Sequence, residues 1–163
     1  MDNTAKAASD VNIIDSIDRV EWPAVAAMFA EVGWGQRDPD QVRAAFAKSS
    51  HVMFIYEAGV LVAFGRTMDD GCYYGMLVDV VVKPGRQHAG LGREIVTCLR
   101  EKLAGYKFIT LTAAPGKEEF YLKLGWLRQS TAMIWPVSDQ QRELHAAAQV
   151  VSQEFSCHIQ NSK

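Results

Sequence analysis

The segment with the clearest chemical potential is 86–92, Arg-Gln-His-Ala-Gly-Leu-Gly, which lies between an apolar run and an amphipathic stretch. In that stretch Leu91, Ile95, Leu99 and Leu103 recur at helical spacing. A strand, a glycine-containing turn and a helix N-terminus in this order point unpaired backbone N–H groups and the helix dipole at one place. Such a turn is suited to holding the phosphates of a ligand.

Two familiar phosphate-binding patterns do not fit this turn. A P-loop ends in Gly-Lys-Ser/Thr, which contacts a terminal phosphate and magnesium, and the turn has no such ending. A dinucleotide-binding turn requires a small residue at the position of Ile95. The pattern favours a diphosphate bound without a metal ion, although a tight turn can have the same composition for steric reasons alone.

The elements around the turn are expected to form a mixed sheet with flanking helices. The pattern predicts strands at 11–14, 51–57, 61–66, 73–83 and 108–113, with one or two more within 126–136. It predicts helices at 22–32, 38–46, 91–104 and 117–124, the second with Asp38 as its N-cap, and a hairpin turn at 58–60. This order is neither all-antiparallel nor a regular βαβ alternation, so the fold class is α/β (α+β).

Length and composition restrict the function classes. The 163 residues, 48% apolar and 22% charged, predict one domain with one buried core. The formal charge of -2 and the even spread of charges argue against nucleic acid as a partner. No apolar run approaches the roughly 20 residues that span a bilayer, so no membrane partner is expected. Cys72, Cys98 and Cys157 lack paired spacing, which favours reduced thiols, no metal site and a cytoplasmic location.

Two motifs together resemble those of a known enzyme family. Residues 80–92, Val-Val-Val-Lys-Pro-Gly-Arg-Gln-His-Ala-Gly-Leu-Gly, resemble the acetyl-coenzyme A (acetyl-CoA) signature of the GNAT superfamily, Gln/Arg-x-x-Gly-x-Gly/Ala after a Val-x-Pro strand end. Gln87, Gly90 and Gly92 occupy its fixed positions. About 30 residues further on, 120–126, Phe-Tyr-Leu-Lys-Leu-Gly-Trp, is similar to the second hallmark of the family.

The resemblance covers roughly residues 11–136 and implies a fold and an activity. It implies a GNAT acetyltransferase domain at 1–137, whose mostly antiparallel sheet has helices on both faces and a central splay between two parallel strands. Residues 138–163 would be a helical or partly disordered extension. The implied enzyme is an N-acetyltransferase that moves acetyl from acetyl-CoA directly to a primary amine in a ternary complex, without a metal. A non-catalytic acyl-CoA sensor of the same fold is the alternative, and a homodimer is left open.

The implied coenzyme site lies on the strand end and the turn. Its residues are Val80, Val82, Arg86, Gln87, His88, Ala89, Gly90, Leu91, Gly92, Arg93 and Tyr121. The diphosphate would sit on the amides of 87–92, with Arg86, His88 and Arg93 near it. The pantetheine arm would run along 79–82, in a gap beside 108–113.

The catalytic roles are also implied by the resemblance. Tyr121 would hydrogen-bond or protonate the coenzyme sulfur, unless it is simply a core tyrosine, and the N–H of Val80 would stabilise the oxyanion. Met76 and Thr110 stand where several family members carry a glutamate. Asp79 is the only carboxylate within this strand, and it would either accept the proton of the acceptor amine or order a bulge in the strand. A chain of water molecules is the other route by which the amine could lose its proton.

The acceptor is expected to be a small-molecule amine. Its implied site contains Phe29, Trp34, Asp79 and Trp135, and aromatic side chains suit apolar or cationic amines. Phe29, however, lies on a core stripe at helical spacing, and packing is the more common role for each tryptophan. Some family members that acetylate small amines, including plant and cyanobacterial serotonin acetyltransferase-like proteins, resemble this chain around Asp79. An arylalkylamine, polyamine, aminoglycoside, amino acid or protein amine all stay open.

Overall fold

The computed structural model describes residues 11–146, and the contacts divide the chain into two units, Met1–Trp126 and Leu127–Lys163. The elements of the first unit are β1 (Val11–Ile14), α1 (Trp22–Glu31), α2 (Pro39–Phe46), β2 (Val52–Glu57), β3 (Val60–Asp69), β4 (Tyr74–Val82), the 3-10 helix η1 (Pro84–Arg86), α3 (Leu91–Lys102), β5 (Phe108–Leu111) and α4 (Glu118–Leu122). Among the described residues, no helix has the length and apolar content needed to cross a membrane.

Five strands form one sheet in the order of the sequence. The first four pair antiparallel, and β4 pairs with β5 in parallel, so α3 is the crossover between two parallel strands. The predicted mixed, mostly antiparallel sheet is therefore confirmed.

Local sequence explains two of the connections. Ala58 and Gly59 have φ of +47° and +78°, as a two-residue hairpin turn between β2 and β3 requires. Asp38 caps α2 by accepting a hydrogen bond from the backbone N–H of Gln41 at 2.9 Å, and Pro39 occupies the first helical position. Both features follow the pattern that the sequence predicts.

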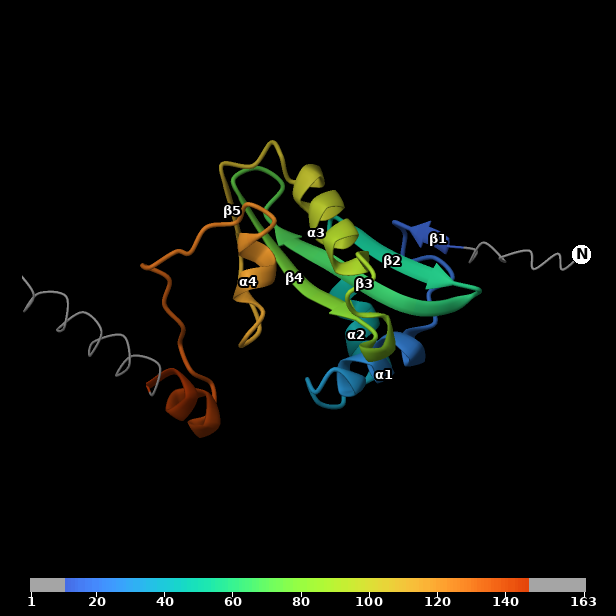
Figure 1. The fold of residues 1–163 in the computed structure, drawn as a ribbon, viewed down its shortest axis with the longest axis horizontal. Helices are drawn as coiled ribbons and strands as arrows, with labels where there is room; N and C mark the ends of the chain where they lie inside the picture. The colour runs from blue at the N-terminus through green and yellow to red at the C-terminus, as the bar shows by residue number, and fades with distance from the viewer. Residues whose placement is uncertain (1–10, 147–163) are drawn as a thin grey trace, which may run out of the picture. The chain divides into compact units, whose positions relative to one another are not determined.

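Helices cover both faces of the sheet (Figure 1). On one face, α1 and α2 pack against Phe54 and Phe64, and on the other α3 places Ile95 against the sheet. A Cβ atom at Gly65 would lie 2.5 Å from Cγ2 of Ile95, and one at Gly75 would lie 2.9 Å from Leu103. Glycine at these two positions therefore lets α3 pack closely on β3 and β4.

The strands predicted within 126–136 are wrong, because the structure describes this segment without any strand. A strand needs a neighbouring edge for its backbone hydrogen bonds, and the described part of the second unit contains no other strand. Several apolar side chains of the segment are exposed, including Met133 at 98%. A helix follows from 139, where Ser138 accepts a hydrogen bond from the N–H of Gln141 at 3.2 Å. Cys157 and the rest of the predicted tail, 147–163, lie outside the described residues.

A hydrogen-bond cluster ties the end of β3 to the loop before β5. Asp69 accepts hydrogen bonds from the hydroxyls of Tyr106 at 2.6 Å, Ser50 at 2.8 Å and Thr67 at 3.0 Å. Partial burial alone would raise the pKa of Asp69, but these hydrogen bonds outweigh it and hold the pKa below its ordinary value. The same contact raises the pKa of Tyr106 to about 12, because an ionised phenol would face the carboxylate.

Asp69→Asn should lower the free energy of unfolding by about 1 kcal/mol near neutral pH, because an amide is a weaker acceptor for the three hydroxyls. The folded pKa of Asp69 is depressed, so its contribution is present above the unfolded pKa and is lost as the pH falls through the folded pKa. Urea denaturation of both proteins from neutral pH down to about pH 3 measures the difference, which should shrink in acid. A difference that stays constant with pH would contradict this explanation.

Candidate functional site

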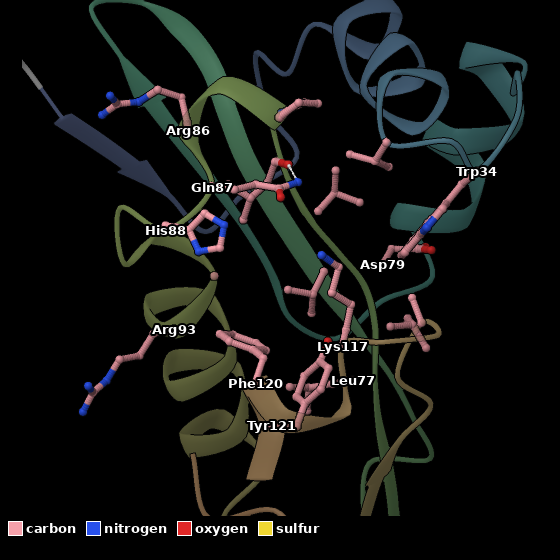
Figure 2. A pocket seen from close by; sticks show the side chains of 18 of the residues that line it. Trp34, Leu77, Asp79, Arg86, Gln87, His88, Arg93, Lys117, Phe120 and Tyr121 are labelled. Atoms are coloured by element: carbon pink, nitrogen blue, oxygen red, sulfur yellow. Dashed lines mark hydrogen bonds between the residues drawn. The ribbon is translucent and has the colours of Figure 1, made fainter. Parts of the chain in front are cut away.

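A cleft of about 710 Å³ opens where β4 and β5 part (Figure 2). The parallel pairing runs from Tyr74 opposite Phe108 to Leu77 opposite Leu111, and β4 continues from there to Val82 along the cleft. The volume is within the range of small-molecule sites. The gap predicted between these two strands is present.

A bulge in β4 explains why the strands part. The register between β3 and β4 shifts by one residue, so Asp79 and Val80 both lie opposite Gly65. Asp79 has a φ of +52°, in the left-handed region that non-glycine residues rarely adopt. A bulge bends and twists its strand, which carries the second half of β4 away from β5.

The carboxylate of Asp79 is held by two arginines. Nε of Arg66, on the neighbouring strand, donates to Oδ2 at 2.6 Å, and Nη1 of Arg37 lies 3.6 Å from Oδ1. The side chains of Asp79 and Arg66 are only 12% and 13% exposed. Because both oxygens already face cations, these contacts favour the alternative in which Asp79 orders the bulge over the one in which it takes a proton from the acceptor.

The loop between α1 and α2 forms one end of the cleft. Trp34, which is 41% exposed, lines the cleft and stacks on Phe29 with ring centroids 6.0 Å apart. The guanidinium of Arg37 lies 3.7 Å from the centroid of the Phe29 ring. Phe29 itself is 0% exposed, so the prediction that it contacts the acceptor is wrong, and it supports Trp34 and Arg37 from the core. Trp135 belongs to the second unit and is 86% exposed, so its contact with the acceptor stays a prediction.

The turn before α3 forms the opposite end. His88 and Gly90 have φ of +65° and +87°, which turns the chain into the helix. The N–H of Glu94 donates to the carbonyl of Gly90 at 3.0 Å, so the amides of 91–93 precede the first helical hydrogen bond and are available to a ligand. The side-chain amide of Gln87 donates to the carbonyl of Val82 at 3.3 Å and fastens the turn to the end of β4.

Gly92, in the first turn of α3, lies close to Phe120 of α4 and Val82 of β4. A Cβ atom there would lie 3.4 Å from Phe120 and 3.5 Å from Val82. Both distances are ordinary van der Waals contacts, so a methyl group would fit at this position, and only a larger side chain would need space beyond them. Ala89 and Leu91, which were also predicted at the coenzyme site, are not among the residues that line this cleft.

The basic side chains of the turn point in different directions. Arg86 bonds through Nη2 to the carboxylate of Glu57 on β2. Figure 2 shows the side chains of Arg86 and Arg93 extending away from the centre of the cleft, whereas the ring of His88 lies at its edge. All three residues line the cleft, and their expected contact with bound phosphates stays a prediction.

α4 brings Tyr121 to the other side of the cleft, with its hydroxyl directed into it (Figure 2). Burial raises the pKa of Tyr121, and its hydroxyl has no hydrogen-bond partner within 11–146. A buried phenol of this kind keeps its proton at neutral pH and can donate a hydrogen bond to a ligand atom.

Two residues of the cleft were not predicted from the sequence. Lys117 reaches into the cleft from the turn before α4, and Glu31 lines it beside Trp34. The spacing of four between Lys117 and Tyr121 is a signal that both lie on one face. For Glu31 the signal is weaker, because the last residue of a helix is usually solvated.

The described residues hold no group of three or more His, Cys, Asp or Glu side chains that could bind a metal ion. The cleft can instead hold an anion on the amides of 91–93, an extended arm along the free edge of β4, and a reacting group near Tyr121.

Comparisons with known proteins agree with this arrangement. The family model described as "Acetyltransferase (GNAT) domain" matches residues 25–133. Serotonin N-acetyltransferase 2, chloroplastic, from Oryza sativa subsp. japonica is 34% identical over 117 residues, which are 68% of this chain and 58% of the rice protein. The chain therefore spans less than two thirds of the length of this relative.

Solved structures share the fold. A GNAT family acetyltransferase from Streptococcus pneumoniae TIGR4 has a TM-score of 0.67 and 19% identity, and the match covers 79% of this chain and 99% of that one. The aminoglycoside N-acetyltransferase AAC(6')-Iy in complex with CoA has a TM-score of 0.63 and 11% identity, and the match covers 80% of this chain and 97% of that one. At these identities the likeness shows the fold alone.

Asp79→Asn should lower the free energy of unfolding by roughly 1–3 kcal/mol, because the largely buried guanidinium of Arg66 loses its charged partner. Arg66→Met should have an effect of similar size. If the two residues form one unit, the free energy of unfolding falls by less in the double variant than by the sum of the losses in the two single variants. Urea denaturation of the parent, the two single variants and the double variant gives the coupling free energy between the two residues. Strictly additive losses of stability would show that the pair does not hold the bulge.

Proposed function

Because this chain belongs to the GNAT acetyltransferase family and is an acyltransferase, we propose that it transfers the acetyl group of acetyl-CoA directly to a primary amine in a ternary complex. One observation carries the proposal. The turn before α3, the free edge of β4 and Tyr121 line a single cleft, in the order that the parts of the coenzyme require. The acceptor end, next to Trp34, belongs to the same cleft.

The residues of the cleft fit the coenzyme. The amides of 91–93 suit the diphosphate, and the left-handed backbone of Gly90 turns the chain into the helix that presents them. The edge of β4 at Val80 and Val82 offers backbone groups to the amides of the pantetheine arm, in the manner of an added strand. When bound, acetyl-CoA supplies the activated thioester.

The roles proposed for the chain follow from these positions. The N–H of Val80 donates to the thioester oxygen as negative charge develops on it. Tyr121 donates a hydrogen bond to the departing sulfur. Burial raises its pKa above the ordinary value of a tyrosine, while a thiol has a pKa of about 8.5. Full proton transfer from the phenol is therefore uphill, and we expect Tyr121 to stabilise the thiolate mainly as a hydrogen-bond donor.

The acceptor has to lose a proton before it attacks. Both oxygens of Asp79 face arginines, so we propose that water in the open cleft takes this proton. Glu31 and Trp34 offer a carboxylate and an aromatic face at the acceptor end, a combination that suits a cationic amine with an apolar body. The name of the rice relative makes arylalkylamines the first acceptors to test.

We propose the cytoplasm as the location, because the three cysteines lack paired spacing and this favours reduced thiols. The name of the rice relative includes the word chloroplastic, so fractionation of cells has to decide between the two compartments. A homodimer likewise stays a proposal, which light scattering of the purified chain tests directly.

The activity is tested by incubating the protein with acetyl-CoA and a panel of arylalkylamines, polyamines, aminoglycosides and amino acids, and measuring the free thiol that is released. We expect amine-dependent release with at least one class. A protein that binds CoA yet releases no thiol with any amine would instead be the acyl-CoA sensor, which the engagement of Asp79 by two arginines would then explain.

Tyr121→Phe should lower kcat by roughly 100-fold or more, because it removes the donor to the sulfur and keeps the ring. CoA affinity and thermal stability should change little, since the hydroxyl has no partner within the described residues. Steady-state kinetics, calorimetric binding of CoA and a thermal melt measure the three quantities. Full activity would remove Tyr121 from the reaction, and a large loss of stability would identify it as a core residue.

A further inference from the structure

The charges around the turn before α3 leave the coenzyme diphosphate short of cationic partners. Arg86 is paired with Glu57, and the side chain of Arg93 extends away from the cleft (Figure 2). The backbone amides of 91–93 provide hydrogen bonds and part of the helix dipole, which is equivalent to about half a unit charge. A diphosphate carries more negative charge than this, so a further cation is expected near it.

Lys117 is positioned to be that cation. Its backbone is fixed by two hydrogen bonds, from its N–H to the carbonyl of Ala114 at 3.0 Å and from the N–H of Phe120 to its carbonyl at 3.1 Å. Figure 2 shows its side chain running from the level of the Tyr121 hydroxyl toward Gln87, inside the cleft.

The ammonium of Lys117 has no salt bridge or hydrogen bond with any residue of 11–146. It extends into the cleft, on the wall opposite the turn before α3. A lysine with a flexible stem and three donors can adjust to a phosphate without a fixed fork geometry. The geometry therefore offers a cation without a partner among the described residues, in the same cleft that the turn before α3 lines.

We infer that Lys117 is a second anchor for the diphosphate of the coenzyme, opposite the amides of 91–93. The inference rests on the proposed use of acetyl-CoA. The diphosphate is clamped between the N-terminus of α3 and the ammonium of Lys117, so the two walls of the cleft are joined through the ligand. Lys117 thereby favours the complete coenzyme over pantetheine thioesters that lack phosphates.

The test measures binding by calorimetry, with NMR titration for weak ligands, and needs no turnover. The variants are Lys117→Met and Lys117→Gln, which remove the charge, Lys117→Arg, which keeps it, and Lys107→Met, which removes a charge outside the cleft. The ligands are CoA, dephospho-CoA, which keeps the diphosphate but lacks the 3′-phosphate, and pantetheine, which lacks all phosphates.

We expect Lys117→Met and Lys117→Gln to bind CoA and dephospho-CoA at least about tenfold more weakly than the parent, and pantetheine equally well. Lys117→Arg should retain most of the affinity, and Lys107→Met all of it. Raising the salt concentration should weaken CoA binding less in Lys117→Met than in the parent, because one charge contact is gone.

Three results would overturn the inference. Undiminished CoA affinity in the charge-removing variants would show that Lys117 does not meet the ligand. A loss that vanishes with dephospho-CoA would move its contact to the 3′-phosphate, and a loss that persists with pantetheine would move it to the thioester end. A parent protein that binds no CoA at all would contradict the proposed function instead, so the two failures can be told apart.

Discussion

The ion pair between Asp79 and Arg66 holds the β4 bulge on which the cleft depends. A non-glycine residue in the left-handed region is strained by about 1–2 kcal/mol, and it persists where its surroundings fix it. Here a 2.6 Å hydrogen bond between two largely buried side chains fixes it to the neighbouring strand. Because the bulge lies directly after the last β4–β5 pair, the two parallel strands separate at that point and the cleft opens between them.

The same carboxylate also contacts the loop that carries Trp34, at one end of the cleft. Arg37 reaches Asp79 from the loop between α1 and α2 and lies on the ring of Phe29, against which Trp34 is stacked. One buried charge therefore links the loop that carries Trp34 to the strand that would bind the pantetheine arm. The carboxylate in the middle of β4 therefore contacts arginines from two other elements of the fold.

The sequence predicted the features that depend on neighbouring residues. The cap at Asp38, the turn at Gly59 and the glycine-containing turn into α3 are each fixed within a few positions along the chain, and the structure contains all three. Hydrophobic periodicity likewise predicted the helices and the mixed sheet. The local sequence pattern is sufficient to predict caps, turns and helices, because neighbouring residues determine their geometry.

Features that depend on distant residues were missed. The pairing of Asp79 with Arg66 requires a register shift between two strands, and that of Arg86 with Glu57 joins residues 29 positions apart. Helical spacing placed Phe29 on a core stripe without showing that Trp34 and Arg37 cover it. The apolar pattern of 126–136 resembles a strand, yet no strand pairs with it in the described part of the chain.

The central claim is that the cleft between β4 and β5 is the coenzyme site, and a crystal structure of the chain with CoA tests it most directly. The account predicts the diphosphate within hydrogen-bond distance of the backbone amides of 91–93, the pantetheine arm along the edge of β4 from Val80 to Val82, and the sulfur beside the hydroxyl of Tyr121. Coenzyme bound anywhere else, with the cleft between the two strands empty, would contradict it.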